Sequence, residues 1–153
     1  MTLAFSQTLN GKPTNFVNKI LQSIPGKATI IFDANFKVIN VTPKIHTIRE
    51  DKKQKWYPGM KIHFVINNRT PQREQFAPVI PCMHTQKISI TYWYNKATEK
   101  HDLPMVLVDD KELTKKQIET LAINDGFENV ADFFAYFNKK FTGKLIHWTD
   151  FKY

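Results

Sequence analysis

Cysteine is nearly absent from this chain, because its 153 residues contain only Cys82. A single cysteine excludes an internal disulfide framework and a zinc site built on four cysteines. Long apolar stretches are also missing: the longest runs have about five residues, too few for a membrane-spanning helix. The first residues, MTLAFSQTLNGKPTNF, lack the basic start and the apolar core of a secretory signal. We therefore expect a cytoplasmic protein that does not enter a membrane.

Several motifs of known chemistry are absent as well. The sequence has no glycine-rich phosphate loop, no Gly-x-Ser-x-Gly and no His-Glu-x-x-His. Its five histidines are scattered, and Cys82-Met-His84 offers two soft ligands without a second pair at zinc-like spacing. We therefore expect neither a metal nor a cofactor.

The composition is that of one folded domain. Hydrophobic residues make up 42% of the chain and charged residues 24%, which argues against disorder. A domain of this length buries enough surface to fold without disulfides or a structural metal. We expect a single domain over residues 1–153.

Charge is distributed unevenly along the chain. The net charge is +8, and residues 1–76 carry 12 basic and 4 acidic groups, whereas residues 77–153 carry 10 of each. Between residues 37 and 73 there are 9 basic and 2 acidic groups. A surface of one sign attracts polyanions, so this half favours a nucleic acid or nucleotide partner. The alternative is a solvated basic face that only aids solubility.

The first half of the chain shows one helical pattern and two strand patterns. Phe16, Ile20 and Ile24 are four residues apart, which predicts a helix with these side chains on one face. Residues 28–41 have the pattern of a hairpin, and residues 61–67 (KIHFVIN) that of a strand.

The second half combines strands and helices. Residues 67–82 hold three prolines and no regular period, which predicts a loop, and residues 86–94 predict a strand. Thr114 and Gln117 fit a capping box at a helix start, and an apolar stripe over residues 130–141 predicts a second helix there. Strands that mostly do not alternate with helices indicate an α+β fold with a small mixed sheet or barrel.

The densest group of reactive side chains lies between Lys44 and Asp51. These eight residues, KIHTIRED, supply an amine, an imidazole, a hydroxyl, a guanidinium and two carboxylates. Lys44 and Thr47 share one side only if the backbone turns or bulges between them. A lysine that is desolvated or next to a cation such as Arg49 can act as a base. The alternative is that the basic residues face solvent and pair with the two carboxylates.

Asp125 is a further candidate, because it continues the apolar face of its helix, four residues after Leu121. A carboxylate on that face, at the negative end of the helix, should have a raised pKa. Such a group suits proton transfer. The alternative is a frayed helix end, at which Asp125 turns to water beside Gly126.

Two motifs in order resemble the ASCH family, a branch of the PUA-like β-barrels. The first is Lys-x-x-Thr-Ile-Arg at Lys44–Arg49, followed by the Pro58-Gly59 turn and a strand. The second is Ala-x-x-Asp-Gly-Phe at Ala122–Phe127, followed by a helix with paired aromatics. The resemblance covers residues 40–153 and implies a small mixed PUA-like β-barrel with two or three flanking helices. Residues 6–40 look like an insertion.

The resemblance also implies an activity. Small bacterial ASCH amidohydrolases act on N4-acetylcytidine, and their catalytic lysine and threonine fall on Lys44 and Thr47. Their catalytic glutamate falls near Asp125, which is one methylene shorter. In such an enzyme Thr47 attacks or orients water, Lys44 accepts its proton, and Asp125 shuttles a proton to the leaving nitrogen.

The expected partner is RNA or a modified nucleoside. Charge, motif and aromatic content together predict the binding residues His46, Arg49, Glu50, Trp56, Arg69 and Arg73. Other ASCH proteins are proposed RNA binders or ribonucleases, so the alternative function is a non-catalytic, basic RNA-binding or regulatory module. Trp56 has its own alternative, since it precedes a Pro-Gly turn and can anchor that loop to the core.

Overall fold

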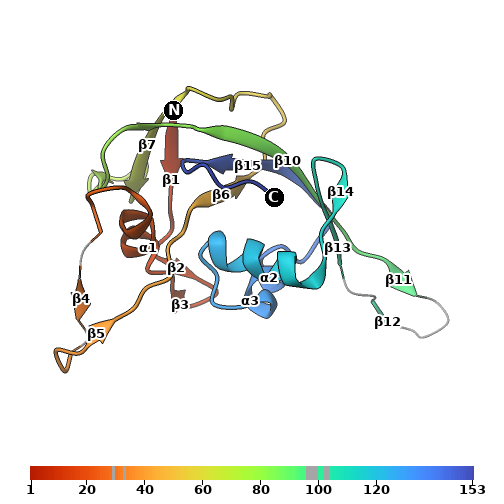
Figure 1. Ribbon diagram of the computed structural model, residues 1–153, viewed down its shortest axis with the longest axis horizontal. Coiled ribbons are helices and arrows are strands. Elements are labelled where there is room, and N and C mark those ends of the chain that lie inside the picture. Colours follow the sequence, from red (N-terminus) through yellow and green to blue (C-terminus); the bar gives the residue numbers. More distant parts are fainter. Residues whose placement is uncertain (29, 33, 96–99, 102–103) are drawn as a thin grey trace.

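Figure 1 shows the computed structural model of the chain, which describes residues 1–28, 30–32, 34–95, 100–101 and 104–153. Three helices are present in this part: α1 (Phe16–Ser23), α2 (Lys115–Asn124) and α3 (Val130–Tyr136). Among the described residues no helix has both the length and the apolar character needed to cross a membrane.

A five-stranded antiparallel sheet organises the C-terminal part of the molecule. Its order is β14 (Lys111–Glu112), β13 (Met105–Val108), β10 (His84–Thr91), β15 (Phe141–His147) and β6 (His46–Arg49). The register aligns His84 with His147, and His147 with His46, across three neighbouring strands. Three imidazoles therefore lie side by side at one end of the sheet.

A second sheet is built around β7 (Lys61–Ile66). It pairs in parallel with β1 (Thr2–Ala4) and antiparallel with β8 (Glu74–Gln75) and β9 (Ile80–Pro81). The loop expected over residues 67–82 is thus wrong in part, because it contains two short pairings with β7. Strands of two residues in a proline-containing segment are too short to show a hydrophobic period, so only the partner strand reveals them.

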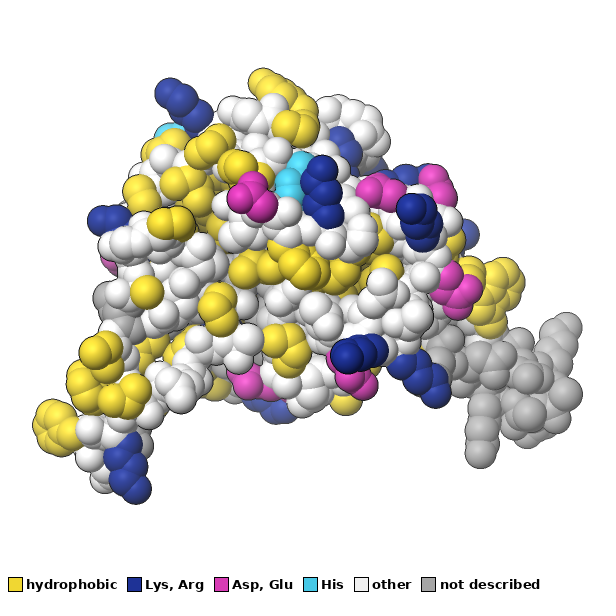
Figure 2. Space-filling view, in the orientation of Figure 1, with side chains coloured by type: hydrophobic (Ala, Val, Ile, Leu, Met, Phe, Trp, Pro, Cys, Tyr) yellow, Lys and Arg dark blue, Asp and Glu magenta, His cyan; other side chains and the backbone are white. Residues whose placement is uncertain are grey.

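Three hairpins complete the strands: β2 (Thr8–Leu9) with β3 (Lys12–Pro13), β4 (Ile31–Phe32) with β5 (Val38–Ile39), and β11 (Tyr94–Asn95) with β12 (Lys100–His101). The hairpin expected at 28–41 is confirmed as β4–β5, while its residues 29 and 33 lie outside the described part. It projects from the body in Figure 1 and carries exposed hydrophobic side chains, visible at the lower left of Figure 2.

Two hydrophobic cores hold the helices to the sheets. In the first, Phe16, Ile20 and Ile24 of the α1 face pack with β1, β7 and Trp148, which confirms the predicted helix. In the second, Phe133 of α3 and Leu121 of α2 pack against the five-stranded sheet. The N-terminal stretch thus contributes α1 to the body of the domain.

The caps that begin α2 and α3 follow from the sequence. The Thr114 hydroxyl accepts from the Gln117 N–H, and the Gln117 side chain accepts from the Thr114 N–H, so the predicted capping box is confirmed. At α3 the Asn129 side chain accepts from the Asp132 N–H. The α+β class is confirmed, while closure of the strands into a PUA-like barrel stays a prediction.

Candidate functional site

Lys44 lies just before β6, and its side chain is buried. Its backbone N–H donates to the Lys19 carbonyl at 2.9 Å, which ties the start of β6 to α1. The residue is 1% exposed, and Nζ donates twice to Asp125: to its backbone carbonyl and, at 3.0 Å, to Oδ1. Nζ also lies 4.8 Å from the centre of the Phe16 ring, a cation–π contact. The alternative of a solvent-facing lysine is therefore wrong.

Asp125 is the C-terminal cap of α2, and its carboxylate turns inward. Oδ1 accepts from Lys44 and from the Ile48 N–H at 3.1 Å. Gly126 follows with a φ of +92°, and a Cβ there would lie 2.8 Å from the Phe16 ring and 3.0 Å from Lys44 Cδ. Glycine is thus needed for the left-handed helix end and for the close approach of Lys44. The frayed end considered from the sequence does not form.

Burial and the ion pair act in opposite directions on both charged groups. Desolvation lowers the pKa of Lys44 and the attraction of Asp125 restores part of it, so the pKa falls from 10.5 to about 8. Burial alone would raise the pKa of Asp125, but Lys44 and His46 outweigh it and hold that pKa below its usual range. The raised carboxyl pKa expected from the sequence is therefore wrong. The carboxylate stays ionised, and Lys44 titrates closer to neutral pH.

A chain of polar contacts lies behind this ion pair. His46 is fully buried, with Nδ1 at 3.4 Å from Asp125 Oδ1, although the alignment is too poor for a hydrogen bond. Its Nε2 lies 2.8 Å from the Tyr153 hydroxyl, which accepts from Asn124 Nδ2 at 3.0 Å. Desolvation lowers the pKa of His46 and keeps it neutral. If Tyr153 donates to Nε2, the imidazole proton sits on Nδ1 and faces Asp125.

Lys44, Thr47, Arg49 and Asp125 line one hollow of about 40 Å³, here called the Lys44 pocket. Thr47 is 3% exposed, and among the described residues its hydroxyl has no hydrogen-bond partner. No hydrogen bond joins it to Lys44 within that part of the chain. The structure thus brings the three expected catalytic residues to one pocket, with the amine and the hydroxyl not yet in contact. His46 lies behind the pocket and does not line it.

Arg49 ends β6 at the other side of the Lys44 pocket. One guanidinium N–H donates to the Ala4 carbonyl at 2.6 Å, and the group lies 5.3 Å from the centre of the Phe5 ring. Its Nε is buried and has no partner in the described part of the chain. No carboxylate among the described residues pairs with Arg49. The guanidinium therefore keeps unused donors.

The other expected binding residues lie elsewhere. Glu50 forms an exposed ion pair with Lys52 at 3.0 Å. Trp56 is 6% exposed and packs in the first core, so in this conformation it is a loop anchor and does not offer its ring to a base. Arg69 and Arg73 are exposed in the segment between β7 and β8 and do not line the Lys44 pocket.

The sequence patterns did not identify two residues of this region, Lys19 and Tyr153. Lys19 is 6% exposed, and its Nζ donates to the Gly126 carbonyl at 2.9 Å. Its place three residues after Phe16, on the apolar face of α1, was the available signal. Tyr153 offers no comparable signal, because its contact with His46 joins residues 107 positions apart.

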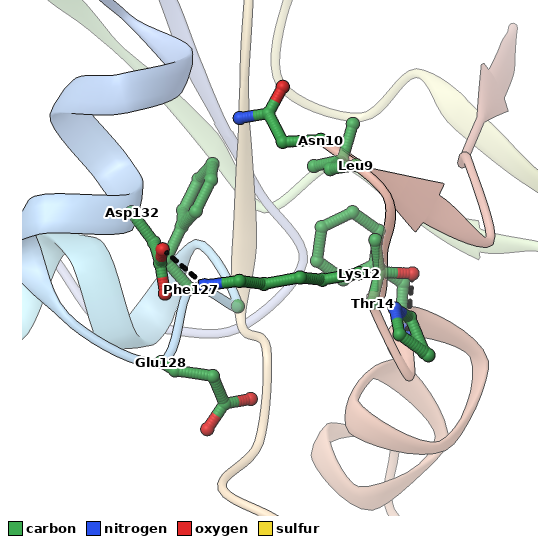
Figure 3. A pocket seen from close by; sticks show the side chains of 10 residues that line it. Leu9, Asn10, Lys12, Thr14, Phe127, Glu128 and Asp132 are labelled. Carbon is green, nitrogen blue, oxygen red and sulfur yellow. Dashed lines mark hydrogen bonds and ion pairs between the residues drawn. The ribbon is translucent and has the colours of Figure 1, made fainter.

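A neighbouring hollow of about 70 Å³ lies between the β2–β3 hairpin and the start of α3. Figure 3 shows Lys12 reaching across it to Asp132, with Nζ 3.1 Å from Oδ1. It shares Leu9, Phe16 and Phe127 with the Lys44 pocket. The hairpin, through Leu9, therefore forms part of the wall that covers that pocket.

Among the described residues, no three His, Cys, Asp or Glu side chains are placed to hold one metal ion. The sequence and structure match no protein-family model, no curated protein and no solved structure.

Proposed function

We propose that this chain is an ASCH-type domain that binds RNA or a modified nucleoside and hydrolyses an amide on a modified base such as N4-acetylcytidine. The observation that carries the proposal is the buried Lys44–Asp125 ion pair with Thr47 in the same pocket. A lysine with a pKa of about 8 is neutral in part of the molecules at physiological pH. Such an amine is a base, whereas a solvated lysine is protonated almost completely.

The reaction begins with a proton transfer between two pocket residues. Lys44 accepts the hydroxyl proton of Thr47 while the threonine oxygen bonds to the acetyl carbonyl carbon. The tetrahedral intermediate then breaks its C–N bond, and Lys44 returns the proton to the leaving N4 amine. Water hydrolyses the acetyl-threonine with Lys44 again as base, which releases acetate. In the other version of this chemistry, Thr47 orients the attacking water.

Asp125 has a different role from the proton shuttle expected from the sequence. Its lowered pKa keeps it ionised, so it is suited to stabilising the ammonium form of Lys44. His46 Nδ1 lies 3.4 Å from this carboxylate, and in the tautomer with a proton on Nδ1 it adds an electrostatic attraction that helps to hold Asp125 in place. Lys44 alone then carries the proton in both directions.

The Lys44 pocket must open for a base to enter. A volume of about 40 Å³ holds roughly three water molecules. This space is too small for a pyrimidine base. We expect Leu9 on the β2–β3 hairpin to be the part of the wall that moves, because the ion pair that joins this hairpin to α3 involves an exposed lysine and is weak. Lys44 and Thr47 can reach hydrogen-bond distance when the ligand is bound, as catalytic contacts often do.

The first experiment is a mass-spectrometric screen of acylated and alkylated nucleosides, with N4-acetylcytidine included. We expect conversion of N4-acetylcytidine to cytidine by the wild type and not by Lys44→Arg, which keeps the charge and loses the titrating amine. Lys19→Arg is the matched control and should remain active. The absence of any hydrolysed acyl nucleoside, or full turnover by Lys44→Arg, would overturn the enzymatic proposal.

The alternative function is a non-catalytic RNA-binding module, and the excess of basic residues in the first half favours it. On the face in Figure 2, however, lysine and arginine side chains are scattered among acidic ones. In this alternative Lys44→Arg is nearly silent. Arg49→Lys is the damaging change, because the planar fork of the guanidinium is lost.

A further inference from the structure

A larger hollow opens directly beside the Lys44 pocket, between the end of β6 and the segment that joins α3 to β15. Its volume is about 390 Å³. Arg49 and Tyr136 line both hollows. The two hollows therefore share part of their wall, and the larger one is here called the β6–α3 cleft.

The lining of the β6–α3 cleft is basic. It contains Arg49, Lys139 and Lys140, and both lysines are exposed. In the described part of the chain neither lysine has an acidic partner. Glu50 also lines the cleft, but its carboxylate is paired with Lys52 at 3.0 Å. The cleft thus keeps an excess of positive charge next to a pocket that holds a balanced pair.

Arg49 connects the two hollows chemically as well as spatially. Its one hydrogen bond within the described residues goes to the Ala4 carbonyl, and Nε is buried, so the donors left for a ligand are the other N–H groups at the outer end of the guanidinium. A guanidinium with a free edge binds phosphate oxygens in a bidentate manner. The side chain is fixed by its contact with Phe5, which reduces the entropy lost when a ligand binds.

The lysines have a simpler possible role, which is to neutralise the C-terminal end of α3. That helix has only seven residues, so its dipole is small. The carbonyl of its C-cap residue is already satisfied, because the Phe137 oxygen accepts from the Tyr92 hydroxyl. Neutralising the helix end therefore does not account for both lysines.

Tyr136 supplies a surface of another kind. Its side chain is 46% exposed and forms part of the wall shared by the two hollows. An exposed aromatic ring beside a basic cleft is a common platform for a nucleotide base or sugar.

We propose that the β6–α3 cleft binds the phosphate group of a nucleotide unit whose base enters the Lys44 pocket. Arg49 contacts the phosphate nearest the pocket, and Lys139 and Lys140 hold it from the opposite wall. The preferred ligand is then a phosphorylated nucleoside, free or within RNA, over the nucleoside alone. The position of the base rests on the proposed function, whereas the phosphate site rests on the cleft itself.

The test compares the binding of cytidine and cytidine 5′-monophosphate by calorimetry at fixed ionic strength. We expect the wild type to bind the monophosphate about tenfold more tightly, the gain of a charge-assisted contact. Lys139→Ala/Lys140→Ala should lose that preference. Lys115→Ala/Lys116→Ala removes two adjacent exposed lysines from α2 and should keep it. Equal affinity of the wild type for both probes, or a preference that survives in Lys139→Ala/Lys140→Ala, would overturn the proposal.

An oligocytidylate of five nucleotides separates the two sources of phosphate. Binding tighter than that of the monophosphate, with a steeper salt dependence, identifies RNA, and equal binding identifies a free nucleotide. The phosphate preference is measured without hydrolysis. If the protein prefers the monophosphate but does not hydrolyse N4-acetylcytidine, the phosphate site is supported and the enzymatic proposal is overturned.

Discussion

Lys19 and Lys44 approach the same end of α2, yet their surroundings differ. Both are buried, and each donates from Nζ to a backbone carbonyl at that helix end: Lys19 to Gly126, Lys44 to Asp125. Lys19 pairs with the carboxylate of Glu128, which is 75% exposed, whereas the carboxylate of Asp125 beside Lys44 is 7% exposed. Of the two lysines, Lys44 lines the pocket that contains Thr47.

The difference shows that burial of a lysine is not by itself a sign of chemistry. Both side chains neutralise the negative end of a helix, which is a structural role. What distinguishes Lys44 is a counter-ion removed from water and a hydroxyl in the same hollow. Equivalent changes at the two lysines should therefore have unequal consequences.

The largest expected effect is on turnover. Lys44→Arg should lower the rate of N4-acetylcytidine hydrolysis by about 100-fold or more, because arginine does not release its proton near neutral pH. Lys19→Arg keeps a donor for the Gly126 carbonyl and should stay within about threefold of the wild type, since it does not line the pocket. Both rates are read from product mass at saturating substrate. Similar losses at the two positions would remove the distinction between them.

The next effect is on stability. Asp125→Asn removes the counter-ion of buried Lys44, which must then stay charged without a partner or lose its proton, and should lower the free energy of unfolding by about 3–5 kcal/mol at pH 7. Asp132→Asn, which breaks the exposed pair with Lys12, should cost less than about 1 kcal/mol. Urea unfolding of both variants measures these losses.

The loss of unfolding free energy in Asp125→Asn, here called the deficit, should depend on pH because the pKa of Lys44 is lowered in the folded protein. Its pKa in the folded protein, about 8, lies below the 10.5 of the unfolded chain, so raising the pH from 8 to 10.5 stabilises the fold. In Asp125→Asn the pKa of Lys44 falls further, so the rise in stability with pH begins at a lower pH than in the wild type. The Asp125→Asn deficit should therefore be smaller at pH 9 than at pH 7. A deficit that grows over this range would contradict the ion pair described here.

The next prediction tests whether the Thr47 hydroxyl in the Lys44 pocket takes part in the reaction. Thr47→Val preserves the shape and removes the hydroxyl, and should lower kcat by about 10- to 100-fold with little change in KM. Thr47→Ser keeps the hydroxyl and should retain turnover within about tenfold. Steady-state kinetics separate the two. Equal activity of the valine and serine variants would exclude Thr47 from the reaction.

The smallest expected effect lies behind the pocket. Tyr153→Phe leaves His46 Nε2 without its partner and should cost about 1–2 kcal/mol of stability, with a several-fold loss of turnover at neutral pH. Tyr57→Phe, at an exposed tyrosine, is the control and should be silent. A Tyr153→Phe variant with unchanged stability and turnover would show that this chain of contacts does not support Asp125.

The sequence predicted the fold class and much of the secondary structure from local patterns. The α1 face, the capping box of α2 and the strand β10 are each determined by neighbouring residues. The short pairings β8 and β9 were not predictable, because their register comes from β7, which is distant in the sequence.

The candidate site shows the same division. Motif spacing singled out Lys44, Thr47 and Asp125, and the fold places all three around one pocket. The pKa of Asp125 was predicted in the wrong direction, since an ion pair between residues 81 positions apart leaves no periodic signal. Trp56 was predicted as a binding residue but is buried, because the exposure of an aromatic side chain cannot be inferred from its position before a turn.

The role of Lys44 as the base is tested most directly by titrating its side chain. The titration is monitored by NMR of protein labelled with ¹³C-lysine, between pH 6 and 11. The Lys44→Arg spectrum assigns the resonance, and Lys19→Arg shows that the assignment is specific. We expect a Lys44 ε-carbon resonance that titrates with a midpoint near pH 8, as follows from a pKa of about 8. A midpoint at or above about pH 10, the range of an ordinary lysine, would contradict the assignment of Lys44 as the base.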